Sequence, residues 1–231
     1  MTAAVLDIEA GVAKQRQDHI SNYFRARRFP LIESMIANIH AKTGQCRILD
    51  IGGRQEYWDP IVASLARYKA HITIVNLEQT QPVGTSGFAF EFGNACDLSR
   101  YADNAFDLAH SNSLLEHVGT WRDMKAAATE TRRVAKSYYV QTPYFWFPLE
   151  PHFRVPFFHW MPEQVRFRLL MKSKLGYIGK ASNVDDAMSN IQSACLLDKT
   201  QFATLFPDAN VGFERVLGLP KSLIAHRQVN G

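Results

Sequence analysis

Short apolar runs alternate with longer amphipathic stretches through the middle of this chain. The runs at 46–51, 71–77, 88–92, 105–110 and 137–142 have the length and composition of buried strands. Helical periodicity follows the first run, over about 57–70, and precedes the last, over 121–134. Alternating strands and helices predict a Rossmann-like, mostly parallel sheet, which we expect to have seven strands and helices on both faces.

The two ends of the chain depart from this alternation. Helical patterns over 12–27 and 31–41, separated by Pro30 and closed by Gly44, predict an N-terminal helical cap. The runs 211–216 and 222–226 predict an antiparallel C-terminal hairpin. We therefore expect a single domain over 1–231, made of the cap (1–45), a core (46–142), an insertion that covers a substrate (143–175, with a helix over 163–174) and the end of the sheet (176–231).

Composition places the chain among ordinary globular proteins. It has 231 residues, of which 46% are hydrophobic and 21% charged. No apolar run approaches the ~20 residues of a membrane span, and no signal peptide is expected. Three widely separated cysteines predict neither a disulfide framework nor a zinc cluster and fit a reducing cytoplasm; they are Cys46, Cys96 and Cys195.

The net charge of +4 is modest. Part of it comes from basic residues near the N-terminus, namely Lys14, Arg16, Arg25, Arg27 and Arg28. Such a cluster could meet an anionic substrate or nucleic acid, but we favour a solvated helix face. No RNA-binding aromatic motif or helix-turn-helix pattern is present, so no nucleic-acid partner is expected.

The stretch 46–54, Cys-Arg-Ile-Leu-Asp-Ile-Gly-Gly-Arg, combines a buried strand with a tight glycine turn. Asp50 stands near the end of the strand, and Gly52 and Gly53 allow a sharp turn into the following helix. Strand, glycine turn and helix open many nucleotide-binding units. Arg54 and Glu56 stand where such loops carry further glycines, so this signal gains its weight from the residues that follow.

Polar residues end the neighbouring strands, where ligands of parallel sheets bind. Besides Asp50–Gly53, this rule selects Glu78, the loop 94–97 and residues 111–113. The Glu78 carboxylate can accept hydrogen bonds from both hydroxyls of a ribose. Asn94 can read an adenine amino group, although a turn-forming role is the alternative.

In this order, RILDIGG, VNLE and FGNACDLSRYADNAFDLAHSNSLLEHVG resemble the class I S-adenosylmethionine-dependent methyltransferases. The similarity is to their small-molecule "methyltransferase type 11" branch; it covers 46–142 well and 196–227 less strongly. The resemblance implies that Asp50, Gly52 and Gly53 lie along the methionine part of S-adenosylmethionine and that Glu78 holds the ribose. It also implies that Asn94, Ala95 and Asp97 frame the adenine and that Ser111 lies beneath the sulfonium. Arg54 in place of a loop glycine, and Asn94 in place of an aspartate, depart from the family pattern.

The proline- and aromatic-rich stretch after the fifth strand is expected to line the acceptor site. We expect substrate contacts from Tyr144, Trp146, Glu150, Arg154 and Trp160. The candidates for a general base are His117, His152 and His159. Glu150 and His152 are too isolated in sequence to predict a metal site.

These features predict methyl transfer from S-adenosylmethionine to an oxygen or nitrogen of a small molecule. The reaction would be an in-line displacement, for which the protein mainly aligns the reactants and excludes water. The alternative is a catalytically silent methyltransferase-like domain that binds or scaffolds a partner, which the glycine-poor loop favours. A nicotinamide dehydrogenase is disfavoured, because its G-x-G-x-x-G fingerprint is missing.

Overall fold

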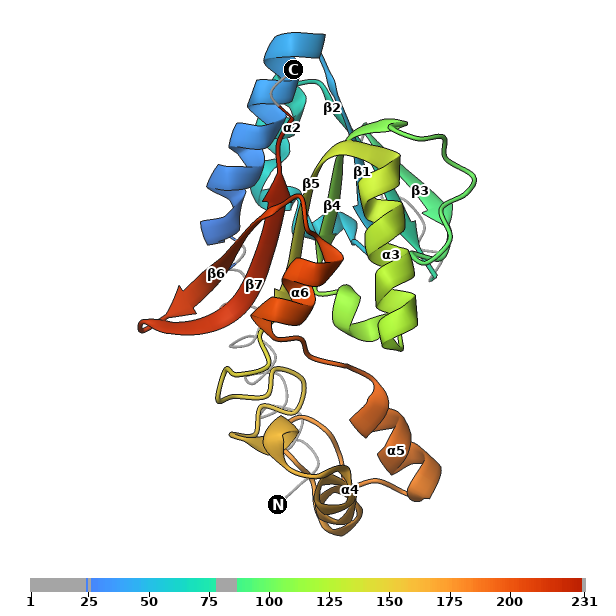
Figure 1. The fold of residues 1–231 in the computed structure, drawn as a ribbon, viewed down its shortest axis with the longest axis vertical. Coiled ribbons are helices and arrows are strands. Elements are labelled where there is room, and N and C mark those ends of the chain that lie inside the picture. The colour runs from blue at the N-terminus through green and yellow to red at the C-terminus, as the bar shows by residue number, and fades with distance from the viewer. Residues whose placement is uncertain (1–23, 25, 78–86, 230–231) are drawn as a thin grey trace, which may run out of the picture.

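A seven-stranded sheet organises the computed structural model, which describes residues 24, 26–77 and 87–229 (Figure 1). The strands lie in the order β3-β2-β1-β4-β5-β7-β6. The first five are parallel and comprise β1 (Cys46–Ile51), β2 (Ala70–Asn76), β3 (Phe88–Phe92), β4 (Phe106–Asn112) and β5 (Ala135–Pro143). The hairpin of β6 (Asn210–Val216) and β7 (Leu219–Arg227) is antiparallel, and β7 pairs with β5. The predicted sheet and hairpin are confirmed.

Helices cover both faces of this sheet, as predicted (Figure 1). On one face lie α3 (Trp121–Val134) and α6 (Lys199–Leu205), whose apolar residues join one buried cluster with β4 and β5. Thr120 and Asp123 form a capping box that fixes the start of α3. The opposite face carries the helix at 26–43 and α2 (Val62–Arg67). The helix predicted over 57–70 is divided into η1 (Gln55–Tyr57), η2 (Asp59–Ile61) and α2.

The helix at 26–43 corrects the prediction that Pro30 separates two helices, because Pro30 lies inside it. A proline removes one backbone hydrogen bond from a helix. Here Phe29, Ile32 and Ile36 are all buried against the sheet, and this burial offsets that loss. Gly44 ends the helix as predicted, with φ at +77° and its N–H donating to the His40 carbonyl over 2.8 Å. Most of the helix predicted over 12–27 lies outside the described residues.

The insertion after β5, together with the residues that follow it up to the end of α5, builds a small body beyond the carboxyl ends of the parallel strands (Figure 1). It contains η4 (Phe158–Trp160), α4 (Glu163–Lys172) and α5 (Val184–Gln192), with a core that includes Phe153, Phe158 and Leu170. On the core side, η3 (Leu115–His117) follows β4 and faces this body, because the Cys195 N–H donates to the Glu116 carbonyl over 2.7 Å. Across the described residues, no helix has the length and apolarity that crossing a bilayer needs.

Candidate active site

The glycine turn after β1 closes over a buried carboxylate. Gly52 has φ at +71°, and its N–H donates to the Val75 carbonyl over 2.7 Å. A Cβ on Gly53 would lie 1.7 Å from Asp50 Oδ2, so only glycine fits there. The same oxygen accepts a hydrogen bond from Trp58 Nε1 over 2.7 Å, and Oδ1 lies 2.7 Å from His110 Nδ1.

Asp50 thus supports the turn from inside the protein, with 1% of its surface exposed. Its predicted contact with the methionine part of the cofactor stays a prediction. Arg54, the departure from the family loop, is exposed, and Trp58 is fully buried in the core. Trp58 is therefore occupied by packing and by Asp50, and does not line the cavity described below.

Neighbouring strands bring several predicted cofactor residues to one edge of the sheet. Ser111 Oγ donates to the Ile51 carbonyl over 3.2 Å, and Asn76 Nδ2 donates to the Gly53 carbonyl over 3.2 Å. These bonds join the ends of β4, β1 and β2, where polar groups could meet a cofactor that carries both charge and hydroxyls. Gly52, Gly53 and Ser111 are brought together, while Glu78 lies outside the described residues.

The loop after β3 folds as a tight turn. Asn94 Oδ1 accepts a hydrogen bond from the Cys96 N–H over 2.9 Å, and Asn94 pairs with Asp97 as an isolated bridge. Hydrogen bonds from the hydroxyl and N–H of Ser99 lower the pKa of Asp97. Ala95 packs against the core. The turn-forming role of Asn94 is therefore present, and adenine recognition by Asn94, Ala95 and Asp97 stays a prediction.

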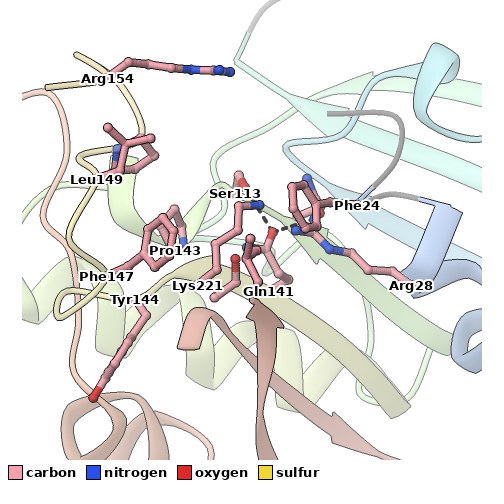
Figure 2. A pocket seen from close by; sticks show the side chains of 14 residues that line it. Phe24, Arg28, Ser113, Gln141, Pro143, Tyr144, Phe147, Leu149, Arg154 and Lys221 are labelled. Carbon is pink, nitrogen blue, oxygen red and sulfur yellow. Dashed lines mark hydrogen bonds between the residues drawn. The ribbon is translucent and has the colours of Figure 1, made fainter. Parts of the chain in front are cut away.

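A cavity of about 460 Å³ opens beside the ends of β4 and β5 (Figure 2). Side chains of the insertion form one wall, and those of the sheet and the N-terminal helix form the other. The lining residues used below are Arg28, Asn112, Gln141, Tyr144, Arg154 and Lys221. The cavity lies next to Ser111, which is the residue predicted beneath the sulfonium. A concave, largely apolar space of this size suits a small organic ligand.

Arg28 holds one side of this cavity together. Its guanidinium donates to both carboxylate oxygens of Glu214, over 2.8 and 2.6 Å. It also donates to the side-chain oxygens of Asn112 and Gln141. Arg28 is only 7% exposed, which corrects the prediction that it belongs to a solvated helix face. Lys14, Arg16 and Arg25 of the predicted basic cluster lie outside the described residues.

Lys221 brings a second cation to the cavity, from the start of β7. Its ammonium lies 3.6 Å from Glu214 Oε2 and 3.7 Å from the centroid of the Phe24 ring. Burial lowers the pKa of Lys221, the attraction of Glu214 opposes this effect, and the charge of Arg28 adds to the lowering, so that the resulting pKa is about 8. Lys221 is therefore an ammonium that can lose its proton close to neutral pH.

The three candidate histidines lie in the insertion or against it, and none of them lines the cavity of Figure 2. His117 and His152 meet each other, with 3.2 Å between their Nε2 atoms. Burial opposes a charge on His152, but the hydrogen bond and charge of Glu150 outweigh it and raise the pKa of His152. His159 lies apart from this pair, with Nε2 2.6 Å from the Phe145 carbonyl, and burial lowers its pKa.

Of the five predicted substrate residues, two line the cavity and three do not. Tyr144 and Arg154 line the cavity. Trp146 and Trp160 are exposed and lie near each other, with 5.9 Å between ring centroids. Glu150 is buried in the insertion, where its carboxylate accepts the Phe153 N–H and contacts His152. The insertion thus contributes to the cavity through part of the predicted set.

Residues 59–138 match the family model described as a methyltransferase domain. This stretch is that of a methyltransferase domain of the type 11 branch. The match runs from η2 to the first residues of β5, and it includes α2, Ser111 and the loop after β3. The predicted family, the class of enzyme and S-adenosylmethionine as the cofactor are confirmed.

Solved structures share the fold of this methyltransferase domain at low sequence identity. A Rhodobacter sphaeroides protein that carries the name of zinc-dependent alcohol dehydrogenases is 9% identical, with a TM-score of 0.51 over 79% of this chain and 83% of that one. The CurJ carbon methyltransferase is 10% identical, with a TM-score of 0.50 over 79% of this chain and 48% of that one. These two likenesses show the fold alone.

A further structure covers more of both chains. The Burkholderia thailandensis 1,6-didemethyltoxoflavin-N1-methyltransferase, solved with S-adenosylhomocysteine, is 16% identical over 94% of this chain and 88% of that one, with a TM-score of 0.47. A search of the curated proteins finds no match.

Sequence reasoning missed Gln141, Lys221 and Glu214 as residues of the cavity and its wall. Gln141 and Glu214 stand in runs that the sequence marks as strands, and Lys221 directly precedes such a run; polar residues there were interpreted as facing solvent. The sequence does not indicate that these residues meet, because the contacts that join them are long-range: Glu214 pairs with Arg28, which is 186 residues away. A polar residue at the carboxyl end of an otherwise apolar strand, such as Gln141 in β5, is the one pattern that could have indicated the site.

Proposed function

We propose that this methyltransferase transfers the methyl group of S-adenosylmethionine to an oxygen or nitrogen of a small molecule held in the cavity beside β4 and β5. The observation that carries the proposal is the position of this cavity. It begins at Asn112, directly after Ser111, and about 460 Å³ would accommodate a small organic molecule. A donor placed over Ser111 and an acceptor in the cavity would then be neighbours.

The walls of the cavity support an acceptor with an anionic or strongly polar group. Among the residues that the structure describes, its lining includes the cations Arg28, Arg154 and Lys221 and no carboxylate. Glu214 offsets one of these charges, so the described part of the lining keeps a positive surplus around an otherwise apolar space. An acceptor that combines a hydrocarbon or aromatic body with a carboxylate or phosphate would meet both features.

Lys221 is our candidate for the base that removes a proton from the attacking hydroxyl or amine. It lines the cavity, and a pKa of about 8 leaves part of it neutral at physiological pH. General bases of this kind contribute roughly 10²–10⁴-fold to a rate. The predicted bases His117, His152 and His159 lie outside this cavity, so Lys221 takes their place in the proposal.

Calorimetric titration with S-adenosylhomocysteine tests the donor half of the proposal. We expect micromolar binding by the wild type and a loss of roughly tenfold or more in Glu78→Ala, because the ribose would lose hydrogen bonds to a charged group. Glu163→Ala on α4 is the matched control and should bind like the wild type. Folded wild-type protein without affinity for S-adenosylhomocysteine would instead favour the silent binding domain.

A screen of small hydroxylated and aminated acids, read out as release of S-adenosylhomocysteine, tests the acceptor half. Lys221→Arg separates the two possible roles of this side chain, since arginine keeps the positive charge but stays protonated. We expect Lys221→Arg to retain acceptor affinity and to lose about 10²-fold or more in turnover. An unchanged turnover in this variant would contradict the assignment of Lys221 as the base.

A further inference from the structure

Three potential metal ligands meet at the junction between the core and the insertion. Glu116 and His117 belong to η3, directly after β4, and His152 belongs to the insertion after β5. One ligand atom from each lies within 4.8 Å of the other two. The two Nε2 atoms are 3.2 Å apart, and His117 Nε2 lies 4.0 Å from Glu116 Oε1. This cluster is separate from the cavity of the proposed function.

The Nδ1 atom of each imidazole already contacts a hydrogen-bond acceptor. His117 Nδ1 lies 2.7 Å from the Ser193 carbonyl, which can only accept, so Nδ1 carries the proton. His152 Nδ1 lies 2.8 Å from Glu150 Oε1. Glu150 accepts the Phe153 N–H with its other oxygen, so this carboxylate acts as an acceptor toward both groups. Each neutral imidazole therefore presents the lone pair of Nε2 to the other.

Two lone pairs at 3.2 Å repel each other unless a positive charge lies between them. That charge can be a proton or a metal ion. The surroundings of Glu116 favour the metal ion over the proton. This side chain is 1% exposed, and its Oε2 accepts a hydrogen bond from Thr142 Oγ1 over 2.8 Å. Its Oε1 is buried and has no hydrogen-bond partner. A proton shared by the histidines leaves this oxygen unsatisfied, whereas a cation bound by all three side chains satisfies it.

The distance between the two histidine nitrogens and the donor types fit a tetrahedral transition-metal ion, and Glu116 Oε1, 4.0 Å from His117 Nε2, would move closer when the ion binds. Zinc–nitrogen bonds of ~2.0–2.1 Å at tetrahedral angles place two ligand nitrogens about 3.3 Å apart, close to the observed 3.2 Å. Two imidazoles and a carboxylate suit Zn²⁺ and its neighbours, whereas Mg²⁺ and Ca²⁺ prefer oxygen ligands. The Nδ1 contacts to a carboxylate and a carbonyl are the outer-shell bonds that orient metal-binding histidines.

We propose that Glu116, His117 and His152 bind one divalent transition-metal ion, with Zn²⁺ as the prime candidate. Three protein ligands leave a fourth position for water or a solute, and both imidazoles are partly exposed. The ion would tie the insertion to the end of β4. The sequence predicts no metal site, because His117 and His152 are 35 residues apart and no local motif joins them.

Metal content and cobalt spectroscopy test the site in the full-length protein, independently of methyl transfer. Protein stripped with a chelator is titrated with Zn²⁺ and, separately, with Co²⁺, whose visible absorption reports a tetrahedral or five-coordinate site. We expect one equivalent of either ion per chain, and a rise in melting temperature with Zn²⁺. Folded wild type that takes up neither ion would overturn the proposal and leave a proton-sharing histidine pair.

Variants locate the ion. His117→Ala and His152→Ala should each lose the cobalt spectrum and at least 100-fold in zinc affinity, whereas His71→Ala on β2 should keep both. Glu150→Gln keeps the shape of the side chain that contacts His152 Nδ1 but removes its charge. We expect 10–100-fold weaker zinc binding in this variant. Circular dichroism confirms that each variant is folded. Wild-type affinity in His117→Ala or His152→Ala, both folded, would place the ion elsewhere and overturn the assignment.

Discussion

Arg28 and Glu214 form a buried, two-pronged ion pair between the N-terminal helix and β6, with 2.6 and 2.8 Å between their paired atoms. The two residues are 186 positions apart in the sequence, and they lie beside the cavity of the proposed function. Because the same guanidinium also holds Asn112 and Gln141, one side chain links the helix to the ends of β4 and β5. The shape of the cavity therefore depends on this helix.

Removing Arg28 should strongly destabilise the protein. Arg28→Met leaves the Glu214 carboxylate buried without its main partner, and breaking such a pair costs about 3–5 kcal/mol. Urea unfolding followed by circular dichroism measures this cost. The neighbouring, exposed Arg27→Met is the control and should cost no more than about 1 kcal/mol.

The double variant Arg28→Met/Glu214→Leu tests the reason for this loss. If the cost comes from an uncompensated charge, removing both charges should recover much of the stability. A double variant that is as unstable as the sum of its single variants would contradict this explanation.

The stability of the protein should fall in acid partly through Glu214. Burial raises the pKa of this carboxyl, but the hydrogen bonds and charge of Arg28, helped by Lys221, outweigh it and lower the pKa. A folded-state pKa below the unfolded value gives stability that is present above about pH 4.5 and is lost as the pH falls through the folded value. The free energy of unfolding between pH 7 and pH 3 should therefore decline less steeply in Glu214→Gln than in the wild type.

Gly53→Ala should damage the glycine turn. The new methyl group would lie 1.7 Å from Asp50 Oδ2, which Trp58 Nε1 holds in place, so either the turn or the carboxylate must move. Overpacking of this kind costs about 1–3 kcal/mol. Gly212→Ala in β6 is a suitable control, since nothing lies within 4 Å of its added Cβ. Thermal unfolding compares the two, and equal melting temperatures would show that the turn tolerates the methyl group.

The sheet could be predicted from sequence because each strand is marked locally. The apolar run 46–51 and the alternation at the hairpin depend on neighbours only a few residues away, and both became strands. The short helices α5 and α6 were missed, although Asn183 and Asp198 cap them, because seven to nine residues hold too little periodicity to stand out.

The sites were less predictable than the fold, for a physical reason. His117 and His152 were each recognised as reactive side chains, but their meeting depends on how the insertion packs against η3. Lys221 owes its low pKa to burial beside Arg28, a residue almost 200 positions away, so no local pattern could reveal it. Residue types can be read from the chain, whereas burial and long-range pairing arise only on folding.

Lys221 should react with amine-directed acylating reagents at a lower pH than ordinary lysines. Its pKa is lowered to about 8, against about 10.4 for an unperturbed lysine. Only the neutral amine is nucleophilic, so its acylation rate should rise with pH and level off above about pH 8–9. Peptide mass spectrometry after brief labelling gives the rate at each pH, with the exposed Lys174 of the same chain as the internal reference.

The cause of this low pKa can be tested through its neighbour. Glu214 attracts the Lys221 ammonium and keeps the pKa from falling further, so Glu214→Gln should move the labelling midpoint of Lys221 to lower pH. The rate at Lys174 should not change, because that side chain lies outside the cavity. A Lys221 midpoint near 10 in the wild type would show that solvent reaches the ammonium freely, and Lys221 could then not serve as a base near neutral pH.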